Sequence, residues 1–99
     1  MARRARITTW YARQFGRLIK SGSERSLALG RTISALIATD ELPGRSDFEA
    51  VEKPIGRAWV RRVGGRNIWL WYRFNESEVM LLTITTEPPI PFDEEPSGA

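Results

Sequence analysis

Two amphipathic helices are predicted in the first 40 residues. Over 10–20 the apolar side chains fall at positions i, i+4, i+7 and i+8, which form one stripe on a helix: Tyr11, Phe15, Leu18 and Ile19. A similar stripe occupies 24–39: Leu29, Ile33, Leu36 and Ile37. Thr8 or Thr9 is suited to cap the first helix and Ser23 the second, and Gly22 separates them. The pattern therefore predicts an antiparallel helical hairpin, preceded by a short strand at 4–8.

The connection that follows the helices is polar. Residues 40–47 (DELPGRSD) predict a loop by their proline and glycine, and 48–53 (FEAVEK) are interpreted as a single helical turn that ends at Pro54. Gly30 lies inside the second predicted helix, where glycine costs about 1 kcal/mol relative to alanine. We therefore expect the two helices to approach closely at Gly30.

Alternating side chains from residue 56 onward predict an antiparallel sheet. Gly64 and Gly65 are a two-residue hairpin signal, because both central positions of the favoured turn need positive φ. This turn would pair Val60 with Trp69. Residues 79–85 are apolar on both faces, which is typical of a central strand. The predicted fold class is α+β, with a short N-terminal strand, a helical hairpin and a three-stranded antiparallel meander that completes a four-stranded sheet.

Alternation also sorts the hairpin side chains onto two faces. One face carries an apolar ladder that we expect to pack on the helices: Ile68, Leu70, Tyr72 and Phe74. The other face mixes aromatic, cationic and small side chains: Ala58, Val60, Arg62, Asn67, Trp69, Trp71 and Arg73. Two interpretations of this face stay open. Trp69 and Trp71 are either ordinary strand residues packed across the sheet, or part of an open groove in which arginines hold phosphates and a ring stacks on a base.

Charge divides the chain into two parts. All 15 basic residues, 13 of them arginine, lie within 1–86 together with eight acidic residues, a net charge of +7 (15 − 8). Residues 87–99 hold four acidic residues, four prolines and no basic residue. We therefore predict one domain over 1–86 and a disordered acidic tail over 87–99, with folding of the tail onto the basic face as a hypothesis. Arginine forks onto phosphate or carboxylate, so the expected partner is a polyanion or an acidic protein.

The composition also excludes several kinds of chemistry. The chain has no cysteine and no histidine, which removes disulfides, thiolate nucleophiles, most zinc sites and the commonest general base. We predict neither a metal nor another cofactor. No apolar run approaches the roughly 18–20 residues of a membrane span, so a cytoplasmic protein that does not enter membranes is expected.

The order of the predicted elements and the residues around the hairpin resemble the RelE/ParE superfamily of bacterial toxins. Members commonly have a glycine, an aromatic residue, an arginine-rich strand, a tight turn and a second strand with arginine and apolar residues. The corresponding residues here are Gly56, Trp59, Arg61-Arg62-Val63, Gly64-Gly65 and Arg66-Asn67-Ile68. The segment AWVRRV (58–63) is similar to the YoeB-like branch, and VMLLTI (79–84) matches the last strand in type. The resemblance covers roughly residues 4–86.

This resemblance implies the toxin of a type II toxin–antitoxin system, neutralised in a hetero-oligomer by an antitoxin that lays a helix or an extended segment over it. RelE, YoeB and HigB types cleave mRNA in the ribosomal A site without metal, whereas ParE types poison DNA gyrase and are not nucleases. We therefore predict growth inhibition by ribosome-dependent mRNA cleavage. The alternatives are a gyrase inhibitor without chemistry, and a non-toxic relative that binds nucleic acid.

Site residues follow from the resemblance position by position. The first-strand arginine of the nuclease branches corresponds to Arg62. The second-strand arginine corresponds approximately to Asn67, and Arg66 is the residue immediately before it. A residue before the first strand, the candidate base, maps onto Lys53 or Glu52. The candidate catalytic residues are Arg62, Arg66, Arg73 and Lys53. The candidate RNA- or partner-binding residues are Arg57, Arg61, Trp69 and Trp71. The tyrosine or histidine that follows the last strand in the nuclease branches has no counterpart within 85–92.

Overall fold

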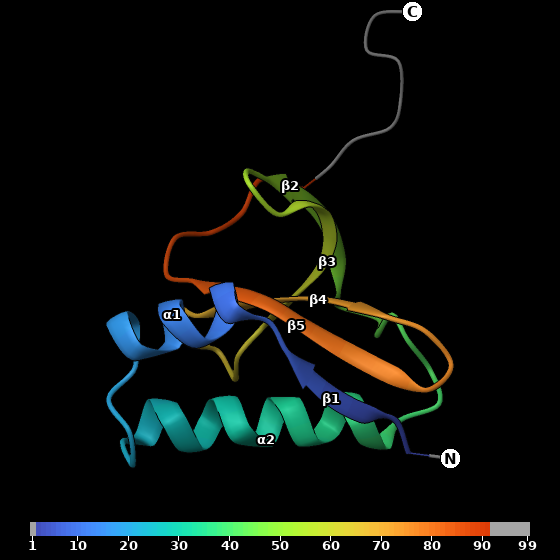
Figure 1. Cartoon of the computed structure of the whole chain (residues 1–99), viewed down its shortest axis with the longest axis horizontal. Helices are drawn as coiled ribbons and strands as arrows, with labels where there is room; N and C mark the ends of the chain where they lie inside the picture. The colour runs from blue at the N-terminus through green and yellow to red at the C-terminus, as the bar shows by residue number, and fades with distance from the viewer. Residues whose placement is uncertain (1, 92–99) are drawn as a thin grey trace, which may run out of the picture.

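Five strands form one mixed sheet in a computed structural model that describes residues 2–91 (Figure 1). The elements in chain order are β1 (Arg4–Ile7), α1 (Thr9–Leu18), α2 (Glu24–Ala38), β2 (Phe48–Glu52), β3 (Gly56–Arg62), β4 (Trp69–Phe74) and β5 (Glu78–Thr85). The strand order in the sheet is β1-β5-β4-β3-β2. β1 runs parallel to β5, and the other neighbours are antiparallel. The α+β class is confirmed, but the predicted four-stranded antiparallel sheet is wrong in strand number and in the direction of β1.

The additional strand is β2, formed by residues predicted as a helical turn. That prediction is wrong because β2 finds a partner in β3, with Ala50 opposite Ala58. Ala50 is completely buried while Val51 is exposed, which is the alternation of a half-buried strand. A helix of five or six residues is not stable alone, so pairing with β3 decides the conformation of this segment.

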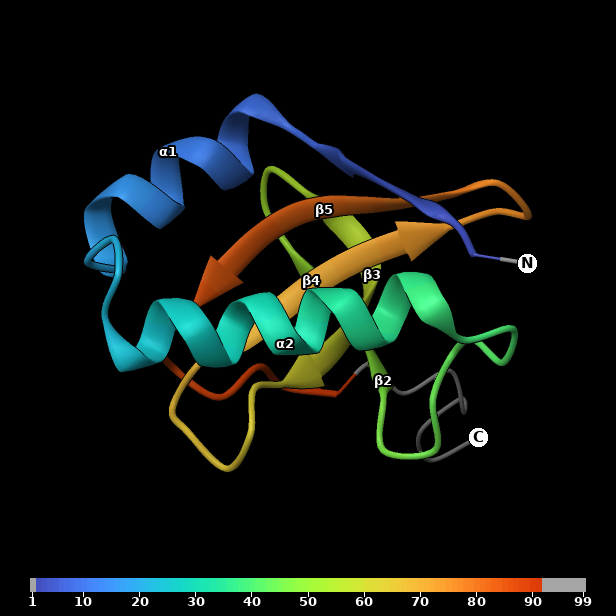
Figure 2. The same cartoon turned by 90° about the horizontal axis from the view of Figure 1, so that it is seen from below.

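Side-chain caps start both helices where the sequence indicates. The Thr8 hydroxyl accepts a hydrogen bond from the Tyr11 N–H at 3.1 Å, and the Ser23 hydroxyl accepts one from the Ser26 N–H at 3.2 Å. The chain reverses direction between α1 and α2 (Figure 2). A Cβ placed on Gly30 would meet no atom within 4 Å, so the predicted close approach of the helices at Gly30 is wrong.

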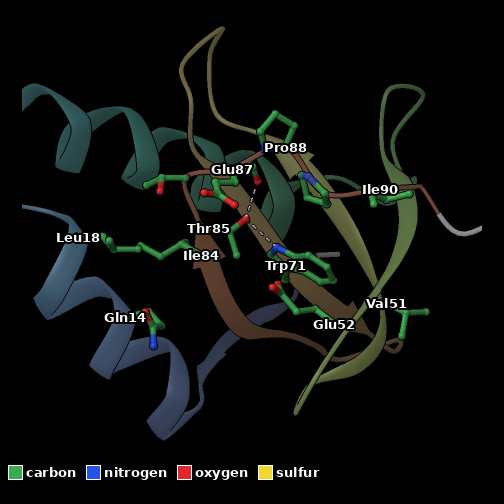
Figure 3. Close-up of a pocket in the computed structure, with 12 residues that line it drawn as sticks. Gln14, Leu18, Val51, Glu52, Trp71, Ile84, Thr85, Glu87, Pro88 and Ile90 are labelled. Atoms are coloured by element: carbon green, nitrogen blue, oxygen red, sulfur yellow. Dashed lines mark hydrogen bonds between the residues drawn. The ribbon is translucent and has the colours of Figure 1, made fainter.

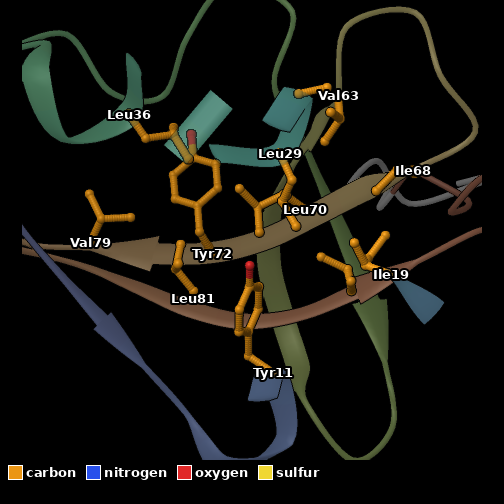
Figure 4. Close-up of a cluster of buried hydrophobic side chains, with 12 residues drawn as sticks. Tyr11, Ile19, Leu29, Leu36, Val63, Ile68, Leu70, Tyr72, Val79 and Leu81 are labelled. Carbon is orange, nitrogen blue, oxygen red and sulfur yellow. The ribbon is translucent and has the colours of Figure 1, made fainter. Parts of the chain in front are cut away.

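The main core lies between the helices and one face of the sheet (Figure 4). Its buried members come from both helices and from the strands: Tyr11, Ile19, Ala28, Leu29, Leu36, Val63, Ile68, Leu70, Tyr72, Val79, Leu81 and Ile84. Ile68, Leu70 and Tyr72 are completely buried there, and Phe74 packs at the border. The predicted ladder on the helix-facing side of β4 is therefore confirmed.

A second apolar cluster fills the opposite face of the sheet. It contains Ala50, Ala58, Val60, Trp69, Trp71 and Leu82. The sheet curls so that β2 and β3 stand across the direction of β4 and β5 (Figure 1). The small Ala50–Ala58 pair leaves room for the large tryptophan rings in this cluster. A bulge in β5 adds to the cluster, because Trp71 pairs with Thr83 and Tyr72 with Leu81, which leaves Leu82 as the extra residue.

The β3–β4 turn has the predicted backbone but a different register. Gly64 and Gly65 have φ of +45° and +73°, and the Arg66 N–H donates to the Val63 carbonyl at 2.8 Å. However, Val60 pairs with Trp71 rather than with Trp69. Because the difference is two residues, every side chain keeps its predicted face.

The chain after β5 returns to the sheet edge. Pro91 forms an antiparallel bridge with Ala50 of β2. The first five residues of the predicted acidic tail, 87–91, are therefore placed beside the folded domain. The remainder of that tail, 92–99, lies outside the described residues. Within the described chain, no helix is long and apolar enough to cross a membrane.

Candidate anion-binding surface

The predicted site residues lie at the two ends of β3. Arg62 and Arg66 lie at its C-terminal end, by the β3–β4 turn. Lys53, Arg57 and Arg73 lie at its other end, near the β2–β3 turn. Five residues of strand separate the two groups, roughly 16 Å. The structure therefore does not bring the four candidate catalytic residues together around one phosphate.

At the β2–β3 end, the arginine side chains donate hydrogen bonds to other residues of the domain. Arg73 donates to the carbonyl of Ile55 at 2.7 Å and to that of Arg57 at 3.0 and 3.1 Å. Arg57 forks onto the Glu49 carboxylate at 2.5 and 2.9 Å. The hydrogen bond from Arg57 holds the pKa of Glu49 below its ordinary value. Lys53 is exposed in the β2–β3 connection.

Arg61 belongs to a buried network centred on Asp47. Its Nε and one terminal nitrogen donate to the two carboxylate oxygens at 2.7 and 2.8 Å. The Gly44 N–H donates to the same carboxylate at 2.8 Å, and the Tyr72 hydroxyl donates to it as well. Burial works to raise the pKa of Asp47, but the hydrogen bonds from Arg61, Tyr72 and Gly44 outweigh it and lower that pKa. Arg61 therefore fastens the 40–47 loop to β3.

Arg62 and Arg66 diverge from the β3–β4 turn. The Arg62 guanidinium lies over the Trp69 ring at 5.3 Å from its centroid, and its Nε donates to the Arg66 carbonyl at 2.9 Å. Arg66 instead reaches α2, where it pairs with the Glu24 carboxylate. Arg62 thus lies on the tryptophan side of the sheet and Arg66 on the helix side.

Arg66 lines a groove of about 280 Å³ between α2 and the β3–β4 turn. The lining residues are Ala28, Arg31, Thr32, Ala35, Arg61, Gly64 and Arg66. We call this set the α2–turn groove. Sequence reasoning missed Arg31 and Glu24 as site residues. The only indication in the sequence is their position on α2. Both residues lie outside the apolar stripe, and therefore away from the face of the helix that is buried against the core.

A cleft of about 410 Å³ lies between α1, β2 and residues 86–90 (Figure 3). Its charged lining residues are two carboxylates, Glu52 and Glu87. Trp71 forms part of its floor and donates from Nε1 to the Thr85 hydroxyl at 3.1 Å. An acidic cleft of this kind repels phosphate.

The tryptophans do not form an open stacking surface. Trp69 is 6% exposed and Trp71 is 1% exposed, so neither ring has a free face for a base. The predicted open groove is therefore wrong for this face, and the other interpretation, of strand residues packed across the sheet, fits the structure. The reason is the curl of the sheet, which encloses both rings in the second cluster.

The arrangement as a whole suits the binding of anions better than proton transfer. Among residues 2–91, no group of three or more carboxylates is placed to hold a metal ion.

Comparisons of the chain with protein-family models, with curated proteins and with solved structures found no match.

Proposed function

We propose that the chain is the toxin of a type II toxin–antitoxin pair of the RelE/ParE kind. We further propose that it inhibits growth by binding its target through arginine side chains. The observation that carries this proposal is the assembly of the sheet: a first strand and two helices precede the antiparallel strands, and β1 lies beside the last strand, β5. β2 extends this arrangement at the far edge.

Unpaired positive charge supports the binding mode. Several exposed arginines have no ion-pair partner among the described residues, including Arg4, Arg17, Arg31 and Arg45. Arginines that are free of internal carboxylates keep their donors available for phosphates or for carboxylates of a partner. A gyrase–DNA complex and an acidic antitoxin both offer such groups.

Ribosome-dependent mRNA cleavage is the second candidate, because Arg62 and Arg66 lie at one turn but direct their guanidinium groups to opposite sides of the sheet. Cleavage needs a base for the ribose hydroxyl as well as charge on the phosphate. The carboxylate paired with Arg66 is Glu24, and the hydrogen bond from Arg66 lowers the pKa of Glu24. A carboxylate with a lowered pKa is a weak base near neutral pH, so this candidate stands second.

The test of toxicity is inducible expression in a bacterial host. Induction is expected to arrest growth, and co-expression of an antitoxin encoded by the neighbouring gene is expected to restore it. A matched control is Leu36→Asp, which places a charge at a completely buried position and should prevent folding. Normal growth on expression of the soluble wild-type protein, or equal arrest by the Leu36→Asp variant, would refute the proposal.

A second measurement separates binding from cleavage. We expect purified protein to inhibit supercoiling by gyrase and to produce no new 5′ ends on translated mRNA in primer extension. New 5′ ends that disappear in an Arg62→Gln variant would instead establish the cleavage mechanism.

A further inference from the structure

We propose that the α2–turn groove binds a phosphate group, held chiefly by Arg31 and Arg66. This inference does not depend on toxicity, because it is drawn from the contacts and burial of the groove residues. The groove brings together α2, β3 and the β3–β4 turn, and three of its seven lining residues are arginines.

The first argument is an unused donor on Arg66. The Nε of Arg66 is buried, and none of the described residues accepts a hydrogen bond from it. A buried donor without an acceptor costs about 1–3 kcal/mol, so such groups are usually satisfied by a partner. An anion between Arg66 and α2 would provide the missing acceptor.

The second argument is the position of Glu24. Its carboxylate contacts one terminal nitrogen of Arg66, while its side chain is 76% exposed. The pKa of Glu24 is lowered first by the hydrogen bond from Arg66, and Arg31 also contributes to the lowering. Glu24 thus holds an anionic group against Arg66, one of the groove residues, on a side chain that is mostly exposed.

The third argument is the charge balance. Arg61 pairs with Asp47 and Arg66 with Glu24, so the three groove arginines and these two carboxylates carry a net charge of +1 (3 − 2). If Glu24 moves away, the net charge becomes +2 (3 − 1). Donors then remain on α2 and on the turn, on two sides of the ligand. A tetrahedral phosphate can accept bonds from several directions, whereas a planar carboxylate is already matched by a single guanidinium fork.

The experiment is a titration of the full chain with inorganic phosphate at constant ionic strength, followed by the ¹H–¹⁵N signals of the arginine Nε–H groups. We expect the Arg66 Nε–H signal to shift in a saturable manner. Arg66→Gln should weaken binding by about 10-fold or more, the typical effect of losing a charge-assisted hydrogen bond. Glu24→Gln should strengthen it by about 2- to 5-fold, because a competing exposed carboxylate is removed.

Two comparisons make the result specific. Arg25→Gln removes the same charge from the same helix at a residue outside the groove, and it should leave phosphate binding nearly unchanged. If Arg66→Gln fails to fold, Glu24→Gln still tests the proposal, because misfolding cannot produce a gain of phosphate affinity. Equal weakening by Arg25→Gln and Arg66→Gln would overturn the proposal, because it would show diffuse attraction only.

A further series distinguishes the source of the phosphate. A short unphosphorylated RNA offers phosphodiesters only, and the same RNA with a 5′-phosphate adds a monoester. Movement of the Arg66 signal by both RNAs would assign the groove to the nucleic-acid backbone, and movement by the second alone would assign it to a terminal or free phosphate. Saturable binding of a glutamate-rich peptide without any response to phosphate would overturn the proposal in favour of an acidic protein.

Discussion

Arg61 donates to both carboxylate oxygens of Asp47, from Nε at 2.7 Å and from a terminal nitrogen at 2.8 Å. The Asp47 side chain is completely buried and the Arg61 side chain is 19% exposed. This pair joins the loop before β2 to β3, and the Tyr72 hydroxyl links the same carboxylate to the main core. The loop and the sheet are therefore held together by hydrogen bonds from Arg61 and Tyr72 to Asp47, and not by apolar packing alone.

The Asp47→Asn variant is expected to lose roughly 2–4 kcal/mol of unfolding free energy. The amide cannot accept both bonds from Arg61, and a partly buried guanidinium is left without its counter-charge. Urea denaturation monitored by tryptophan fluorescence measures the loss. The control is Glu76→Gln, a change from carboxylate to amide at an exposed residue, which should stay within about 0.5 kcal/mol of wild type. Equal stabilities of the two variants would contradict the structural role of Asp47.

The same pair predicts how stability depends on pH. Because the pKa of Asp47 is lower in the folded protein than the ordinary value near 3.9, the unfolded chain takes up the proton first. The contribution of Asp47 is therefore fully present above about pH 5 and is lost as the pH falls through the folded-state pKa. The unfolding free energy of wild type should fall more steeply below about pH 4 than that of Asp47→Asn. Parallel pH dependences of the two unfolding free energies would contradict this role of Asp47. Glu24 and Glu49 titrate in both proteins, so they do not produce a difference between the two curves.

Local signals in the sequence predicted much of the fold. Thr8 and Ser23 cap the helices by hydrogen bonds to residues three positions later, and Gly64 and Gly65 adopt positive φ as their lack of a Cβ allows. Such features depend on neighbours in the chain, so they can be predicted from the sequence. β2 could not be predicted in this way, because its conformation depends on pairing with β3.

The candidate site was predicted less well, because it depends on the curl of the sheet. The alternation of Trp69 and Trp71 gives the correct face but not its burial, which follows from β2 and β3 turning across β4. The contact of Arg66 with Glu24 spans 42 positions of sequence, and nothing local indicates it. Residue type thus predicted which side chains carry charge, but not which of them lie together.

Trp71→Phe tests whether this tryptophan acts in binding or in packing. The ring is 1% exposed and packs in the second cluster, so the smaller ring should leave a cavity and cost about 1–3 kcal/mol of unfolding free energy. Binding of phosphate or RNA by the folded variant should equal that of wild type. Trp10→Phe is the control, since Trp10 is 37% exposed and its replacement should change stability little. Weaker RNA binding at unchanged stability would restore a stacking role for Trp71.

Two glycine substitutions should change stability in opposite directions. Gly30 lies on an exposed part of α2 and a Cβ there meets nothing within 4 Å, so Gly30→Ala should raise the unfolding free energy by about 0.5–1 kcal/mol through helix propensity. Gly65 also has open space around it, but its φ of +73° is strained for alanine, so Gly65→Ala should lower the unfolding free energy by about 1–2 kcal/mol. Urea denaturation of the two variants compares the same glycine-to-alanine change in two backbone conformations, one helical and one with positive φ. A loss of stability in Gly30→Ala would show that another surface covers α2 in solution, because the helix itself has space for the methyl group.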